Sequence, residues 1–250
     1  MNLFDVSGKR VVITGGATGL GKGMAEGFVD SGAKVVILDI SPRLTDTITE
    51  LSKKGTVHGM HTDLSREECR ISAFKEATET LGGIDVMVNC AGVQRRYPSE
   101  EFPLDEWDFV INTNLTAVFH MCQLAGNEML KTGRGKIINV ASMLSYFGGY
   151  TVPAYAASKG GVAQLTKALS NEWAKKGVNV NAIAPGYMAT DMNTAIIENE
   201  ERNKQITARI PVGRWGTPND VKGVLLFLAS SASDYISGAV IPVDGGYLGC

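Results

Sequence analysis

The sequence predicts an α/β fold in which a seven-stranded parallel sheet is doubly wound and carries helices on both faces. Short β-branched runs alternate with helical patterns along the whole chain, and a glycine-rich turn follows the first run. No linker, internal repeat or low-complexity segment interrupts this alternation. Parallel strands need right-handed crossovers, and the helical patterns supply them. We therefore expect a single domain over residues 1–250.

The first elements are a strand at 11–14, a glycine-rich turn at 15–21, a helix that ends near Ser31, and a strand at 35–38 that leads into Asp39. Glycines let the backbone approach a pyrophosphate, and the next helix offers free N–H groups and its positive dipole end. The Asp39 carboxylate would accept hydrogen bonds from the adenosine ribose and would repel a 2′-phosphate. The order of these elements predicts a Rossmann-type dinucleotide site that favours NAD over NADP.

The later elements continue the alternation. We expect strands at 56–60, 84–88, 136–140, 178–183 and 239–243, and helices at 66–81, 104–131, from Pro153 onward, and at 218–229. Ligands of such sheets bind beyond the carboxyl ends of the strands. This rule gathers onto one rim the residues that follow each strand: Gly15, Asp39, Asp63, residues 89–92, Ser142, Pro185 and Gly186.

Tyr155 and Lys159 lie four residues apart at the start of the helix after Pro153, so one turn brings both to the same face. An ammonium near a phenol favours the phenolate, which would make Tyr155 a usable base. Taken alone, this spacing is more typical of a surface tyrosine with a solvated lysine. Its place on the ligand rim, with the Ser142 hydroxyl thirteen residues upstream, favours a catalytic function.

Three features have two interpretations each. Asn114 falls on the apolar stripe of the long helix, where it is either a satisfied core amide or the ligand of an ordered water. Arg95 and Arg96 follow the fourth strand and either grip a substrate carboxylate or are solvated or inter-subunit arginines. The polar segment at about 188–214 is either a substrate lid, which we favour, or a surface excursion.

Composition excludes several classes of protein. The formal net charge is −2 and the basic residues are scattered, so we expect no nucleic-acid partner. The four cysteines lack Cys-x-x-Cys spacing and do not cluster with the three histidines, so we expect no metal site and a reducing compartment. We interpret His58, His61 and His120 as structural. No signal peptide or membrane span is visible, which predicts a cytoplasmic location.

Together these residues resemble the short-chain dehydrogenase/reductase family over essentially the whole chain. Thr14, Gly15, Gly19 and Gly21 match its cofactor motif, and Asn114, Ser142, Tyr155 and Lys159 match its catalytic tetrad. The chain departs from the family's Asn-Asn-Ala-Gly motif, because Cys90 stands at the second position and any side-chain bond of that asparagine is lost. The resemblance implies an NAD(P)-dependent alcohol dehydrogenase or ketoreductase that acts on CH–OH groups and forms a homotetramer.

The resemblance also implies the residues of each site. Cofactor contacts are expected from Gly15, Thr18, Gly19, Leu20, Gly21, Asp39, Asp63, Leu64, Cys90, Ala91, Gly92, Tyr155, Lys159, Pro185, Gly186, Met188 and Thr190. Substrate contacts are expected from Arg95, Ser142, Met143 and Tyr155. Tyr155 would exchange a proton with the substrate oxygen, Ser142 would donate a hydrogen bond to it, Lys159 would lower the tyrosine pKa, and Asn114 would position a relay water.

Four segments, at 141–145, 171–175, 181–190 and 213–216, resemble one subgroup of the family that acts on sugar acids. The expected substrate is therefore a sugar acid of the 2-deoxy-D-gluconate or 2-dehydro-3-deoxy-D-gluconate type. Two alternatives stay open. The chain could oxidise gluconate or act on another alcohol or ketone, such as a polyol, a steroid or an acyl-carrier ketone. More remotely, it could be a non-catalytic nucleotide sensor on the same fold, although a sensor has no need of the tyrosine–lysine pair.

Overall fold

The computed structural model describes residues 2–250. Seven parallel strands form one sheet in the order β3-β2-β1-β4-β5-β6-β7. The strands are β1 (Arg10–Thr14), β2 (Lys34–Asp39), β3 (Val57–His61), β4 (Val86–Asn89), β5 (Gly135–Val140), β6 (Val178–Pro185) and β7 (Val240–Val243). The chain leaves β1 toward one edge and returns to β4 on the other side, so the strand order reverses at the β1–β4 pair. The predicted fold class is confirmed.

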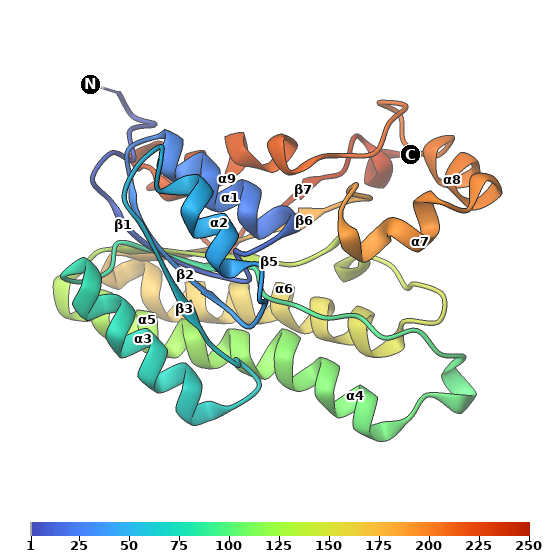
Figure 1. Ribbon diagram of the computed structural model, residues 1–250, viewed down its shortest axis with the longest axis horizontal. Helices are drawn as coiled ribbons and strands as arrows, with labels where there is room; N and C mark the ends of the chain where they lie inside the picture. The colour runs from blue at the N-terminus through green and yellow to red at the C-terminus, as the bar shows by residue number, and fades with distance from the viewer. Residues whose placement is uncertain (1) are drawn as a thin grey trace.

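Helices cover both faces of the sheet (Figure 1). One layer contains α1 (Gly19–Asp30), α2 (Leu44–Leu51) and α9 (Lys222–Ala229). The other contains α3 (Glu67–Leu81), the long helix built from α4 (Leu104–Ile111) and α5 (Ala117–Thr132), and α6 (Pro153–Trp173). Two short helices, α7 (Thr194–Ile197) and α8 (Glu200–Thr207), lie apart from both layers near the C-terminus (Figure 1).

Strand side chains alternate between two buried cores. Val11 and Ile13 of β1 face the core under α1 and α9, whereas Val12 faces the core under α3, α5 and α6. All three are fully buried, as expected for a central parallel strand covered on both faces. This packing explains why the strands are continuous apolar runs in the sequence and holds the carboxyl ends of the strands at one rigid edge.

Three features of the helices differ from the sequence-based expectations. The short helix α2 was not expected, because Leu44–Leu51 contains three threonines and an isoleucine that disfavour a helix in isolation. The long helix contains a π-helical turn at Asn112–Thr116. The polar segment after β6, for which no helix was expected, contains α7 and α8. Over residues 2–250 no helix has the length and apolarity to cross a membrane.

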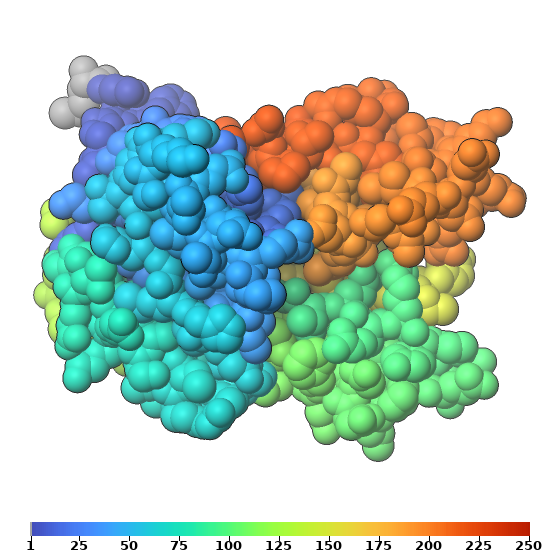
Figure 2. All heavy atoms as spheres, in the orientation of Figure 1, coloured from blue at the N-terminus to red at the C-terminus, as the bar shows by residue number. Residues whose placement is uncertain are grey.

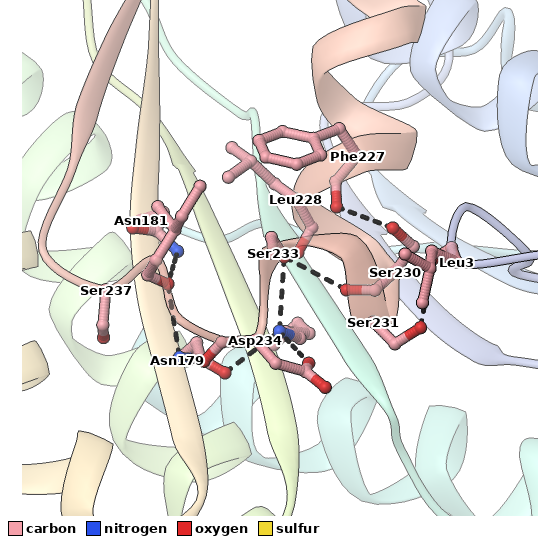
Figure 3. A network of polar contacts seen from close by, with 12 residues as sticks. Leu3, Asn179, Asn181, Phe227, Leu228, Ser230, Ser231, Ser233, Asp234 and Ser237 are labelled. Carbon is pink, nitrogen blue, oxygen red and sulfur yellow. Dashed lines mark hydrogen bonds and ion pairs between the residues drawn. The ribbon is translucent and has the colours of Figure 1, made fainter.

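A polar network ties the C-terminal part of the chain to the amino-terminal ends of β5 and β6 (Figure 3). Lys136 is buried in β5, and its Nζ donates to Asp234 Oδ1 at 2.7 Å, Asn179 Oδ1 at 3.0 Å and Ser233 Oγ at 3.2 Å. Burial lowers the lysine pKa, and the bond to Asp234 opposes that effect. Because these strand ends lie opposite the ligand rim, the network braces the sheet away from the pocket.

Candidate active site

One pocket, with a volume of about 410 Å³, lies at the carboxyl edge of the sheet. This volume is within the range of small-molecule sites. The surface in Figure 2 is hollowed where the blue N-terminal segments meet the orange and green segments. All residues expected to hold the cofactor line it: Gly15, Thr18, Gly19, Leu20, Gly21, Asp39, Asp63, Leu64, Cys90, Ala91, Gly92, Tyr155, Lys159, Pro185, Gly186, Met188 and Thr190. Ser142 lines it too, whereas Asn114, Arg95 and Met143 do not.

The glycine-rich turn forms one wall of this pocket. Gly15 has φ +71°, and a Cβ there would lie 2.6 Å from Ala91 Cα, so only glycine fits. Thr18 gives no side-chain cap to α1, whose first residues line the pocket with their N–H groups free for an anion. Asp39 is held rigidly, because Oδ2 accepts from the Ala17 N–H and Oδ1 from the Ser41 N–H, both at 2.8 Å.

Tyr155 and Lys159 lie together in the first turns of α6, as their spacing predicts. The Lys159 Nζ lies 5.7 Å from the centre of the Tyr155 ring and donates to the Val140 carbonyl at 2.7 Å. Burial raises the pKa of Tyr155 to about 12, while Ser142 and Arg96 pull it down. Burial also lowers the pKa of Lys159 to about 8. The expected lowering of the tyrosine pKa by Lys159 is not seen in this geometry, where burial dominates and only Ser142 and Arg96 lower the pKa.

Ser142 follows β5 and begins a short 3₁₀ turn. Its Oγ accepts from the Leu144 N–H at 3.1 Å, a bond that does not use the hydroxyl proton, and its proximity lowers the pKa of Tyr155. The Ser145 Oγ donates to the Lys159 carbonyl at 2.7 Å and so fastens this turn to α6. The serine, tyrosine and lysine are therefore held in one fixed arrangement.

Asn114 is fully buried in the π-helical turn. Its Oδ1 accepts from the Val93 N–H and its Nδ2 donates to the Val93 carbonyl, both at 2.8 Å. Nδ2 also lies 3.2 Å from Ser158 Oγ. The amide is thus satisfied by protein groups, which fits the core interpretation. A Cβ on Gly92 would lie 3.3 Å from Asn114 Oδ1 and 3.6 Å from Lys159 Nζ, so both polar atoms lie close to this glycine.

Cys90 stands where the family motif has its second asparagine, and the backbone at this position is nevertheless fixed by hydrogen bonds. The Thr14 Oγ1 accepts from the Cys90 N–H at 3.1 Å and from the Ala91 N–H at 3.2 Å. Burial raises the pKa of the Cys90 thiol to about 11, so the thiol stays protonated at neutral pH. The loss of an asparagine side chain therefore does not disturb the backbone that lines the pocket.

The two adjacent arginines differ in their partners. Arg95 Nε pairs with Glu106 Oε2 at 2.7 Å, and its guanidinium lies 4.8 Å over the Phe109 ring. Arg96 has no carboxylate partner among residues 2–250; its closest polar contact is Gln94 Oε1 at 3.4 Å. Burial and the nearby charge of Arg202 lower the Arg96 pKa, while Tyr187 and Tyr155 raise it. Arg96 is thus the cation left free beside the tyrosine.

The segment at 188–214 begins and ends at the same point of the molecule. Met188 and Gly216 form a parallel bridge, and the Ala189 N–H donates to the Gly216 carbonyl at 2.8 Å. Its inner side packs in a small apolar cluster of Met143, Ile206, Ile210 and Tyr247. Met143 therefore contacts this segment rather than lining the pocket. Arg43 pairs with Asp191 at 2.6 Å and joins the segment to the loop after β2.

The pocket also contains residues that the sequence pattern did not single out: Leu38, Ile40, Thr62, Ser65, Val93, Phe109, Thr113, Val140, Ala141, Asp191, Met192 and Asn193. Most are neighbours of predicted residues and could have been found from the rim rule. Phe109 and Thr113 could not, because they reach the pocket from a helix: Phe109 from α4 and Thr113 from the π-helical turn.

Comparison with known proteins agrees with this geometry. A family model described as enoyl-(acyl carrier protein) reductase matches residues 15–248. The 2-dehydro-3-deoxy-D-gluconate 5-dehydrogenase of Bacillus subtilis is 45% identical over 246 residues, which cover 98% of this chain and 96% of that protein. This is the sugar-acid subgroup that the four signature segments resemble, also described as 2-deoxy-D-gluconate 3-dehydrogenase, so that resemblance is confirmed.

Solved structures agree as well. A provisionally named 2-deoxy-D-gluconate 3-dehydrogenase from Agrobacterium tumefaciens with bound NADP is 42% identical, with a TM-score of 0.94 and full coverage of both chains. A gluconate 5-dehydrogenase from Burkholderia cenocepacia, in complex with NADP and tartrate, is 34% identical, with a TM-score of 0.93 over 100% of this chain and 98% of that one.

The fold and these relatives define an α/β oxidoreductase. The chain belongs to the short-chain dehydrogenase/reductase family, whose members depend on NAD or NADP.

Proposed function

We propose that this protein transfers a hydride between a secondary alcohol or ketone of a sugar acid and a nicotinamide dinucleotide. The preferred substrates are of the 2-deoxy-D-gluconate or 2-dehydro-3-deoxy-D-gluconate type. The observation that carries the proposal is the convergence of Ser142, Tyr155 and Lys159 on one pocket. Arg96, which has no carboxylate partner among residues 2–250, lies outside the pocket lining but close enough for its charge to act on Tyr155. The names of the relatives support the sugar-acid class.

The residues of the site divide the work. A nicotinamide in this pocket would supply the hydride acceptor or donor. Tyr155 takes the alcohol proton during oxidation and returns it during reduction, while the free Ser142 hydroxyl proton is donated to the substrate oxygen. Lys159 keeps a cation near the phenol. A water above Gly92, between Asn114 Oδ1 and Lys159 Nζ, would link this cation to a proton relay.

The pocket suits a dinucleotide, with uncapped N–H groups at the start of α1 for a pyrophosphate and the fixed Asp39 carboxylate at the adenosine end. We infer that NAD is preferred, because the carboxylate repels a 2′-phosphate. The exposed Arg43 nearby and the NADP in three solved relatives favour the opposite preference. Asp39→Asn should raise the NADP/NAD ratio of kcat/KM at least about tenfold. A wild type that strongly prefers NADP would contradict the inference.

We assign the substrate carboxylate to Arg96, since the Arg95 guanidinium is already neutralised by Glu106. Arg96→Gln should raise KM for an aldonate roughly 10–100-fold, because it removes a charge-assisted contact, and should change KM for a neutral polyol little. Arg95→Gln is the matched control and should have a smaller effect on the aldonate. Equal losses for the acid and the polyol would count against this assignment.

We also propose that residues 188–214 act as a substrate lid on the single domain. The bridge between Met188 and Gly216 gives the segment a common base, and an exposed ion pair, Arg43–Asp191, joins it to the far side of the pocket. Limited proteolysis should cut this segment first, and dinucleotide plus substrate should protect it. Cleavage at the same rate with and without the two ligands would favour the interpretation of this segment as a surface excursion.

The proposed activity is tested by following NADH and NADPH formation with a panel of aldonates, polyols and hydroxysteroids. Activity confined to polyols or steroids would support the alternative of another alcohol substrate. Dinucleotide binding without turnover of any of them would support a sensor. By family analogy we expect a cytoplasmic homotetramer, in which the long helices pair at one interface and the β7 region at another, and light scattering in solution tests the tetramer.

A further inference from the structure

Arg70 is a buried cation whose charge the proposed chemistry does not use. It lies in α3 with 4% of its surface exposed, and it forms no ion pair within the described chain. Its Nη1 donates to the Leu64 carbonyl at 2.7 Å and its Nε to Nδ1 of His120, in α5, at 2.9 Å. A buried guanidinium is costly unless its N–H groups are directed at acceptors. Here both acceptors are neutral, and one of them can be protonated.

The Leu64 carbonyl belongs to the loop that follows β3 and lines the pocket. Asp63, Leu64 and Ser65 all border the pocket. The Asp63 carboxylate accepts from the Ser65 N–H at 2.9 Å and from its Oγ at 2.7 Å, and these bonds lower the Asp63 pKa. Asn112 Nδ2 donates to the Ser65 carbonyl at 2.8 Å. Two side chains from the helix layer, Arg70 and Asn112, thus hydrogen-bond to this loop and fix the pocket wall formed by Asp63 to Ser65 from its outer side.

We propose that Arg70 and His120 are positioning residues for the adenosine half of the dinucleotide, and that protonation of His120 releases this hold. Only neutral His120 can accept from Arg70 through Nδ1. A protonated imidazole offers an N–H in that place and a second positive charge, so it turns an acceptor into a repelling donor. The Leu64 carbonyl then loses a fixed partner, and the wall formed by Asp63 to Ser65 loosens. The inference rests on the proposed dinucleotide site.

The charges around His120 agree with this direction. The charges of Arg70 and Glu67 of α3 act on the imidazole, and the Arg70 charge also acts on the carboxylates of Asp63 and Glu68. Burial lowers the His120 pKa, Arg70 lowers it further, and Glu67 opposes them. The neutral form is therefore favoured in the fold, its contribution is complete above pH ~6.5, and it is lost as pH falls below that value.

The test measures binding of NAD and of ADP-ribose by calorimetry between pH ~5 and ~8, with nicotinamide mononucleotide as the arm that lacks adenosine. Wild-type affinity for NAD and ADP-ribose should fall roughly tenfold through the titration of His120, the size expected for one hydrogen bond to a charged group. The mononucleotide should show no such fall. His120→Asn keeps a neutral acceptor and should bind NAD tightly at both ends of the range.

His120→Phe removes the acceptor and should bind NAD at neutral pH about as weakly as acidified wild type. Arg70→Lys cannot reach both acceptors and should weaken NAD binding in the same way. His58→Asn alters an exposed histidine of β3 and serves as the matched control, with a wild-type pH profile. In turnover assays at neutral pH, His120→Phe should raise KM for the dinucleotide and leave kcat unchanged, whereas His120→Asn should keep the wild-type KM.

Three results would overturn the inference: a pH-dependent loss that persists in His120→Asn, tight binding by His120→Phe, or an equal loss for the mononucleotide. If wild type binds no dinucleotide at any pH, the proposed function fails together with this inference. If wild type binds NAD and turns over a sugar acid while the His120 variants behave like wild type, only the inference fails.

Discussion

In the proposed mechanism the Tyr155 hydroxyl exchanges a proton with the substrate oxygen while Ser142 donates a hydrogen bond to that oxygen. Tyr155→Phe removes the hydroxyl and keeps the ring that packs near Lys159. Turnover should fall by roughly 10³-fold or more, because general acid–base catalysis is lost. The dissociation constant for NAD should change less than about threefold, which calorimetry can measure. Full activity in this variant would remove the basis for the proposed mechanism.

The high pKa of Tyr155 sets the pH dependence of the two directions. Burial raises this pKa to about 12, so the phenolate is a minor form at neutral pH. Oxidation needs the phenolate, and kcat/KM for the alcohol should rise with pH by up to about tenfold per unit. Reduction needs the phenol and should stay level through neutral pH. Steady-state rates measured in both directions test the direction of this pH dependence. An oxidation rate that falls between neutral and alkaline pH would contradict the prediction.

Residues that follow strands were predictable from the sequence, because a parallel sheet brings all carboxyl strand ends to one edge. This is why the glycine turn, Asp39, Ser142 and the α6 pair were found without coordinates. The choice between Arg95 and Arg96 was not predictable. It depends on Glu106, which comes from the next helix and pairs with only one of them. Such a difference arises from tertiary contacts and leaves no mark in local spacing.

At the scale of elements, α5 and α6 meet at a glycine. A Cβ on Gly126 would lie 2.6 Å from the Trp173 ring, so Gly126→Ala should force the helices apart. We expect a loss of about 1–3 kcal/mol in the free energy of unfolding, as for other overpacked cores. Gly223→Ala, in the first turn of α9 with no neighbour near its Cβ, is the control and should gain up to about 1 kcal/mol. Urea denaturation of both variants distinguishes packing from helix propensity.

Long amphipathic helices and apolar strands were predictable as elements, whereas irregular ones were not. The π-helical turn at Asn112–Thr116 adds one residue to a turn whose sequence still fits an ordinary helix. From this turn, Asn114 forms a hydrogen bond with Val93 and Asn112 forms one with Ser65, on the two sides of the pocket. The apolar stripe indicated that Asn114 is buried, but its partners follow only from the changed helical phase. The site therefore depends on an irregularity that periodicity cannot detect.

At the scale of the whole molecule, Glu26 of α1 links the helices that cover one face of the sheet. Its carboxylate pairs with Lys222 of α9 and with Lys54 after α2, both at 2.6 Å, and these bonds lower its pKa to about 2. A lowered carboxyl pKa gives stability that is complete above the usual value of 4.5 and is lost as pH falls toward about 2. Glu26→Gln should therefore cost about 1 kcal/mol at neutral pH, discounted for partial exposure, and nothing at pH ~2. Glu50→Gln breaks the more exposed Lys22 pair and should cost less than Glu26→Gln at neutral pH, so thermal unfolding of the two variants against pH tests whether partial burial sets the difference.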